Sequence, residues 1–250
     1  MLQRERLVLL AGLTAVLALA WAWLLSGAGM AMTPFEMTAM AGMDGWLMRP
    51  AVWSPSYALL VFAMWWVMMV AMMLPSATPA ILLYARVREM RNGDGRISQT
   101  WVFLAGYAAV WLLFSLSAAT LQRLVTGASM ALDHPLADAG VLIAAGLYQL
   151  SPLKSACLGQ CRAPAQFISA HWRPGAAGAV RLGVLHGAYC VGCCWMLMAL
   201  LFVGGVMNLL WVVALAVIVA AEKLVPHGFW LSRILGAALI LWGALRISGT

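Results

Sequence analysis

Long apolar runs separated by short polar and basic segments make up most of this 250-residue chain. Several runs reach the roughly 20 residues that a helix needs to cross about 30 Å of hydrocarbon. Backbone polar groups must pair internally in lipid, and continuous runs of this length pair them as helices. The pattern predicts an all-α, polytopic transmembrane helical bundle forming a single domain over residues 1–250. Its seven spans are expected near residues 7–25, 56–79, 101–122, 136–153, 181–203, 206–221 and 230–247.

The composition supports a bilayer environment. Hydrophobic residues make up 64% of the chain and charged residues only 9%, with a mean hydropathy of +0.92. Soluble domains carry about a quarter charged residues, so this composition excludes an ordinary water-exposed surface. The lipid bilayer is therefore the first expected partner.

The basic residues indicate topology. The formal charge of +7 is divided among short loops, which argues against a nucleic-acid partner. A cytoplasmic N-terminus places 12 of the 15 basic residues on the inner side, as the positive-inside rule requires. These residues are Arg4, Arg6, Arg86, Arg88, Arg91, Arg96, Lys154, Arg162, Arg173, Arg181, Lys223 and Arg233.

The first span also has features of a secretory signal peptide. Arg4 and Arg6 precede the apolar stretch, and the small residues 26–28 follow it. Its 19 apolar residues exceed the usual length of a signal core, which favours a retained span. Cleavage would leave six spans and the same candidate sites.

Two features bear on helix packing. Pro75 and Pro79 are expected to kink or end the second span, because proline cannot donate the helical hydrogen bond. Gly183 and Gly187 form a small-residue face on the fifth span, where another helix can approach closely.

Eleven of the 17 methionines lie between Met30 and Met73. Six fall within 19 residues of the expected outer loop 26–55. Thioethers are soft ligands for Cu(I) and form no disulfides in an oxidising space. Packing in the lipid headgroup region is the alternative. The candidate ligands here are Met30, Met32, Met37, Met40 and Met43, with Met48 beside them.

A second group of methionines lies within the second span. Met64, Met68 and Met72 recur every four residues, so they share one face of a helix, and Met69 and Met73 widen that stripe. Such a ladder could pass Cu(I) through the membrane. Methionine is also a common filler of packed cores, and both interpretations stay open.

All five cysteines lie in two later clusters. Cys157 and Cys161 follow the fourth span at helical spacing, whereas Cys190, Cys193 and Cys194 lie inside the fifth span with His186 one turn earlier. The spacing lacks the second pair of a zinc module. A buried cysteine is often only a small apolar side chain, but two clusters predict a soft-metal site.

Polar residues near the inner side suggest charge balance. Gln149 needs a partner within the membrane, and Lys154 could neutralise a metal–thiolate charge. Glu222 and Lys223 are adjacent and are expected to pair with each other. Ordinary anchoring at the inner face is the alternative for both lysines.

Several motifs resemble those of a known family. They are Ala71-Met72-Met73-Leu74-Pro75, Tyr148-Gln149-x-x-Pro152-Leu153-Lys154-x-x-Cys157-Leu158, Gly192-Cys193-Cys194-Trp195 with Met198, and Glu222-Lys223. Over roughly residues 58–246 the chain resembles domain of unknown function 2182, a bacterial family described as predicted metal-binding integral membrane proteins. The resemblance implies metal association in a bacterial inner membrane and no established reaction.

The residues favour a Cu(I)-binding membrane protein, not an enzyme, that acts in copper transport or delivery. A copper chaperone or a membrane complex is the expected protein partner, and the oligomeric state stays open. One alternative is a structural or assembly subunit of a larger membrane complex. Another is a membrane thiol oxidoreductase using Cys190 and Cys193, although two thiols one helical turn apart bridge only with distortion.

Overall fold

The computed structural model of this protein describes residues 3–29, 34–39, 53–92, 97–125, 131–132 and 134–248. These residues form helices joined by short segments, which confirms the all-helical prediction. The helices are α1 (Gln3–Leu25), α2 (Pro34–Ala39), α3 (Pro55–Asn92), α4 (Ser98–Val125), α5 (Pro135–Leu150), α6 (Pro152–Arg162), α7 (Pro164–His171), α8 (Gly175–Ala199), α9 (Leu201–Gly204), α10 (Leu209–Leu224) and α11 (Gly228–Ser248).

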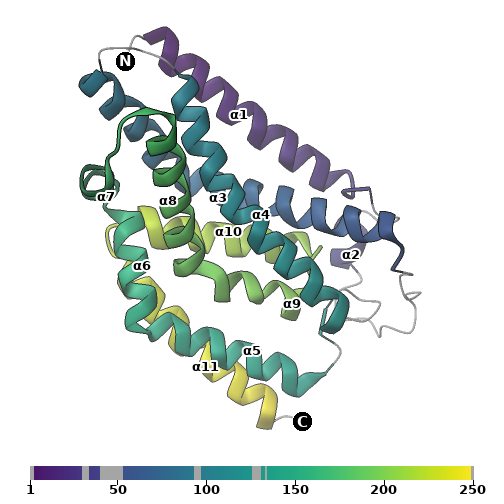
Figure 1. The fold of residues 1–250 in the computed structure, drawn as a ribbon. Coiled ribbons are helices and arrows are strands. Elements are labelled where there is room, and N and C mark those ends of the chain that lie inside the picture. The colour runs from purple at the N-terminus through teal and green to yellow at the C-terminus, as the bar shows by residue number, and fades with distance from the viewer. Residues whose placement is uncertain are drawn as a thin grey trace.

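Helix α3 is the central element of the bundle. It packs against α1, α4 and α10, and its methionines from Met64 to Met73 are buried. Helix α4 packs along α8, and α5 packs along α11 (Figure 1). Helix α8 also contacts α6 and α5.

The helices match the expected spans only in part. Within the described residues, five segments are long and apolar enough to cross a membrane: α1, α3, α4, α8 with α9, and α11. Helices α5 and α6 qualify only as one span, bent by 62°. Helix α10 has 16 residues and rises about 24 Å, which is short of a hydrocarbon core of about 30 Å.

The helix of the second expected span does not end at Pro75 or Pro79, so of the two outcomes predicted there an end of the helix is wrong. Helix α3 continues through Pro75 and Pro79 to Asn92. The Ser76 hydroxyl donates to the Met73 carbonyl at 3.0 Å, and Thr78 donates to the Leu74 carbonyl at 2.8 Å. Hydroxyl groups of this kind satisfy carbonyls around a proline and let an apolar helix continue.

The close approach predicted at Gly183 and Gly187 is confirmed. A Cβ atom at Gly183 would collide with the Phe103 carbonyl of α4, and one at Gly187 would lie 3.0 Å from the Val110 side chain. Gly106 of α4 meets the Val180 carbonyl in the same way. The contact between α4 and α8 is therefore nearly backbone to backbone, which fixes the position of the cysteine-bearing helix.

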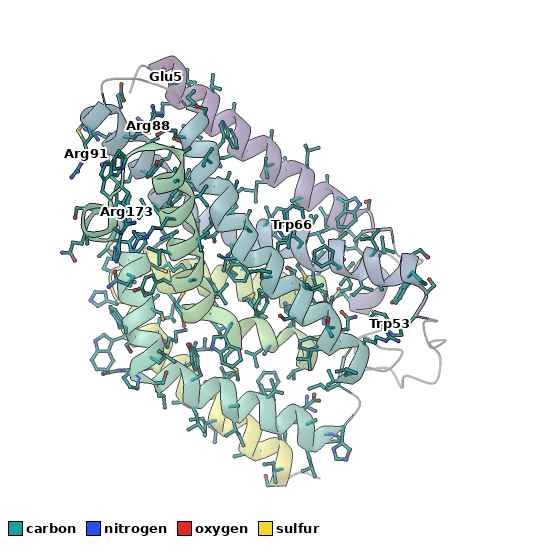
Figure 2. All side chains as sticks on the ribbon, viewed as in Figure 1. Glu5, Trp53, Trp66, Arg88, Arg91 and Arg173 are labelled. Carbon is teal, nitrogen blue, oxygen red and sulfur yellow. The ribbon has the colours of Figure 1, made fainter. Side chains whose placement is uncertain are left out.

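The outer surface is apolar along the helices. Large side chains such as Leu124 and Leu210 are 76% and 73% exposed. Figure 2 places Arg88, Arg91 and Arg173 at one end of the bundle and Trp53 toward the other.

Candidate metal centre

Helix α8 carries three buried thiols, those of Cys190, Cys193 and Cys194, each 1% exposed. The thiols of Cys193 and Cys194 donate to the Cys190 carbonyl at 3.1 and 2.9 Å. Consecutive helical residues point about 100° apart. Cys193 and Cys194 therefore face different neighbouring helices.

Cys193 faces α6, where its Sγ atom lies 4.0 Å from that of Cys161. With a metal–sulfur bond of about 2.3 Å, this separation corresponds to an angle of about 120° at a shared ion. The pair can thus hold a thiophilic ion without a large movement of either helix.

The bend between α5 and α6 brings Cys161 to this position. Ser151 precedes Pro152 and adopts an extended backbone, which ends α5, and its side chain accepts a hydrogen bond from the Lys154 amide at the start of α6. A residue before proline disfavours the helical conformation, and serine is a good N-cap. The sequence Ser151-Pro152 therefore turns α6 toward α8.

Cys194 faces α3, where its Sγ atom lies 3.9 Å from the Met73 thioether sulfur. Both residues are fully buried. This contact joins the second and fifth expected spans through sulfur, and it selects Met73 from the predicted stripe. Adjacent cysteines thus give α8 one thiol–thiol pair and one thiol–thioether pair.

Cys190 contacts polar groups in the core. The Lys223 ammonium of α10 donates to its Sγ atom at 3.0 Å, and the Tyr107 hydroxyl of α4 lies 3.1 Å from the same atom. Lys223 also donates to the Ser76 hydroxyl at 3.3 Å. The sequence analysis missed Tyr107, which shares no spacing with the cysteines. It predicted that Lys223 pairs with Glu222 or anchors the inner face.

Cys157 and Cys161 are half-buried, and all five cysteines are free thiols. The Cys157 sulfur fills the space above Gly192 of α8, where a Cβ atom would lie 2.8 Å away. The Tyr148 hydroxyl donates to the Gly192 carbonyl at the same place. The α6 cysteines therefore lie between the surface and the buried thiols.

His186 is buried among the rings of Phe103, Tyr107 and Phe167, with centroids 5.5 to 6.1 Å away. Its Nδ1 atom makes no hydrogen bond within the described part of the chain. The ring lies one helical turn before Cys190 on the same helix. The ring contacts aromatic side chains, so its role as a metal ligand stays a prediction.

The remaining candidate methionines divide into two groups. Met64, Met68 and Met72 are buried in the core, and Met68 lines a small cavity with Met207 of the α9–α10 connection. Met30, Met32, Met40 and Met43 lie outside the described residues, as does the side chain of Met37. The outer-loop ligands stay a prediction.

The donor set suits a soft ion. Among the described residues, no three side chains of His, Cys, Asp or Glu converge on one point as a metal cage. The sulfurs occur as pairs, one of which includes methionine. Thiolates and thioethers at low coordination number suit Cu(I), whereas structural zinc requires four ligands.

The expected pairing of Glu222 with Lys223 is wrong. Glu222 accepts from the Lys154 ammonium at 2.6 Å and from the Gln149 amide at 2.8 Å. Gln149 also accepts from Lys154, so the three side chains form one buried network. Adjacent residues on a helix point in different directions, and Lys223 faces Cys190 instead. The Lys154 ammonium thus binds a carboxylate, and the Lys223 ammonium donates to a thiol.

Comparison with known protein families gives a match that covers most of the chain. Residues 62–246 match the model of a family described as "PpoB2: Copper chaperone". No curated protein and no solved structure matches the chain. The matched segment contains all five cysteines, Met64 to Met73, and the residues that contact Cys190.

Proposed function

We propose, since this chain belongs to the PpoB2 family of copper chaperones, that it is an integral membrane protein that binds Cu(I) on paired sulfurs and delivers it to a partner. Binding and transfer require no bond-making catalysis, so the protein is proposed as a carrier and not an enzyme. The observation that carries the proposal is the pair of sulfur contacts made by the adjacent residues Cys193 and Cys194.

The membrane assignment is supported by length, composition and surface. Five helices of the described residues have the length and hydropathy of membrane spans, and leucines are exposed along the bundle. An exposed apolar surface of this extent is unfavourable in water. The gathering of arginines at one end agrees with a cytoplasmic N-terminus in a bacterial inner membrane (Figure 2).

The choice of Cu(I) is supported by the ligand chemistry. Thiolate and thioether sulfur select soft ions, and Cu(I) is the soft state of copper. Four sulfurs from α3, α6 and α8 form the two pairs, and the half-buried Cys161 belongs to the pair nearer the surface. An ion could pass between pairs by exchanging one sulfur at a time, because each pair alone is a weak site.

The proposed route runs between the α6 cysteines and the buried core, in either direction. Cys157 and Cys161 would exchange copper with a cytoplasmic protein, and the methionines of loop 26–55 would exchange it outside. Met64, Met68 and Met72 would connect the two ends through the core of α3. Lipid and a copper-accepting protein are thus the proposed partners.

Two other functions are alternatives to copper delivery. A thiol oxidoreductase built on Cys190 and Cys193 gains no support from the contacts, because the sulfur contact of Cys193 with a residue outside its own helix is to Cys161. A structural subunit of a membrane complex would use the same sulfurs for packing alone.

The experiment is metal analysis of the full chain purified in detergent without oxygen from copper-supplemented cells. The wild-type protein should retain near-stoichiometric copper, and the double variant Cys161→Ser, Cys193→Ser should lose most of it. Met69→Leu controls for the loss of a buried sulfur, because Met69 is as buried as Met73 but, unlike Met73, makes no hydrogen bond with a thiol of the described residues. A wild-type protein without copper would remove the proposed function and favour the structural subunit.

A further inference from the structure

The Lys223 side chain is a cation in an unusual position. The residue is 7% exposed, and its ammonium contacts the Ser76 hydroxyl and the Cys190 sulfur. Within the described residues no carboxylate pairs with Lys223, and the adjacent Glu222 pairs with Lys154 instead. An ammonium removed from water without a counter-ion is strongly unfavourable.

The nearest groups able to carry a compensating negative charge are the thiols of α8. The Lys223 ammonium lies 3.0 Å from the Cys190 sulfur, and Cys193 and Cys194 follow on the next turn of the same helix. The hydroxyl of Tyr107 approaches Cys190 from another side and can donate to a sulfur anion. Lys223 and Tyr107 therefore place a positive charge and a hydrogen-bond donor beside the Cys190 sulfur, where a metal-bound thiolate would need them.

We propose that Lys223 is the built-in counter-ion of a copper–thiolate complex that includes Cys190, and that its charge restricts the site to monovalent soft cations. This inference rests on the proposed function of the same site, and it specifies the charge of the ion that the site binds.

The proposal follows from a count of charges. Cys190 and a second thiol of α8, that of Cys193 or Cys194, form a complex with one negative charge when they release their protons to water and bind one monovalent cation. The ammonium of Lys223 brings the sum to zero. A divalent ion such as Zn²⁺ between the same two thiolates forms a neutral complex, which leaves the buried ammonium uncompensated. Coulomb interactions are strong at low dielectric, so the neutral sum is preferred.

The polar network beside Lys223 keeps this charge balance separate. Glu222 is adjacent in sequence, but its carboxylate is held by Lys154 and Gln149 at 2.6 and 2.8 Å. The two consecutive charges of α10 are thus directed to different helices. A carboxylate free to reach Lys223 would cancel the selectivity.

The experiment is a competition between Ag⁺ and Zn²⁺ for the full chain in detergent, with the bound metals measured after equilibration without oxygen. Lys223→Met and Lys223→Gln remove the charge, and Lys223→Arg retains it. Relative to wild type, the ratio of bound Ag⁺ to bound Zn²⁺ should fall roughly tenfold or more in the two neutral variants. It should stay unchanged in the arginine variant.

The two neutral variants guard against misfolding, because glutamine keeps a hydrogen-bonding group near Ser76 and methionine supplies an apolar chain of similar length. An unchanged ratio in a folded neutral variant overturns the counter-ion role and leaves the copper function standing. A wild-type protein that binds neither cation overturns both.

Discussion

The buried pair of Lys154 and Glu222 supports the sharpest stability prediction, because it holds the cysteine-bearing helix α6 against α10. The Lys154 Nζ atom lies 2.6 Å from Glu222 Oε2, and the side chains of Lys154 and Glu222 are 1% and 2% exposed. Lys154→Met leaves the Glu222 carboxylate in the core with the Gln149 amide as its recorded side-chain donor. Removing one partner of a buried pair costs about 3–5 kcal/mol.

The expected loss corresponds to a decrease in Tm of roughly 6–20 °C for a chain of this size. The assay is thermal unfolding of the purified protein in detergent, followed by circular dichroism. The double variant Lys154→Met, Glu222→Gln should recover most of the loss, because it removes the uncompensated carboxylate. Arg173→Met, an exposed change on the same protein, should alter stability by less than about 0.5 kcal/mol.

The double variant Lys154→Met, Glu222→Gln tests whether the two side chains interact. If its destabilisation equals the sum of the two single variants, Lys154 and Glu222 do not interact and the network does not hold α6 in place. A single-variant loss below about 1 kcal/mol would show that the pair is solvated in the folded protein.

Three further predictions concern the centre. Gly183→Ala should destabilise the protein by about 1–3 kcal/mol, because the added methyl separates α4 from α8; thermal unfolding measures this loss. Met73→Leu should weaken Cu(I) retention against a competing chelator roughly tenfold, about 1.4 kcal/mol, because a thioether ligand is lost. Met69→Leu should leave retention unchanged. Equal retention in the two variants would exclude Met73 as a ligand. Tyr107→Phe should also weaken Cu(I) retention about tenfold, because a charge-assisted hydrogen bond to Cys190 is lost. The same chelator assay measures the change, and retention equal to that of the wild type would contradict this prediction.

Helix content and most helix positions could be predicted from the sequence. The apolar runs are long, and a continuous run can pair its backbone groups only as a helix in an apolar surrounding. The helix boundaries were harder to predict from the sequence. Proline predicted an end near residue 79, but the hydroxyls of Ser76 and Thr78 satisfy neighbouring carbonyls and α3 continues. Conversely, Ser151-Pro152 does turn the chain, by 62°.

Spacing identified the cysteines as candidates because residues three and four apart share a helix face. It could not assign their partners. Cys193 and Cys194 belong to one cluster in sequence, yet one contacts Cys161 of α6 and the other Met73 of α3. Such pairings depend on which helices are neighbours, and helix spacing carries no information about neighbours.

The sequence alone determined an all-helical, strongly apolar chain with soft sulfur ligands in separate clusters, since periodicity and composition are local properties. Only the tertiary structure decided which sulfurs meet and where the charges of Glu222 and Lys223 are directed. The physical reason is that buried charges and thiols interact over a few ångströms, across helices that lie far apart in the chain.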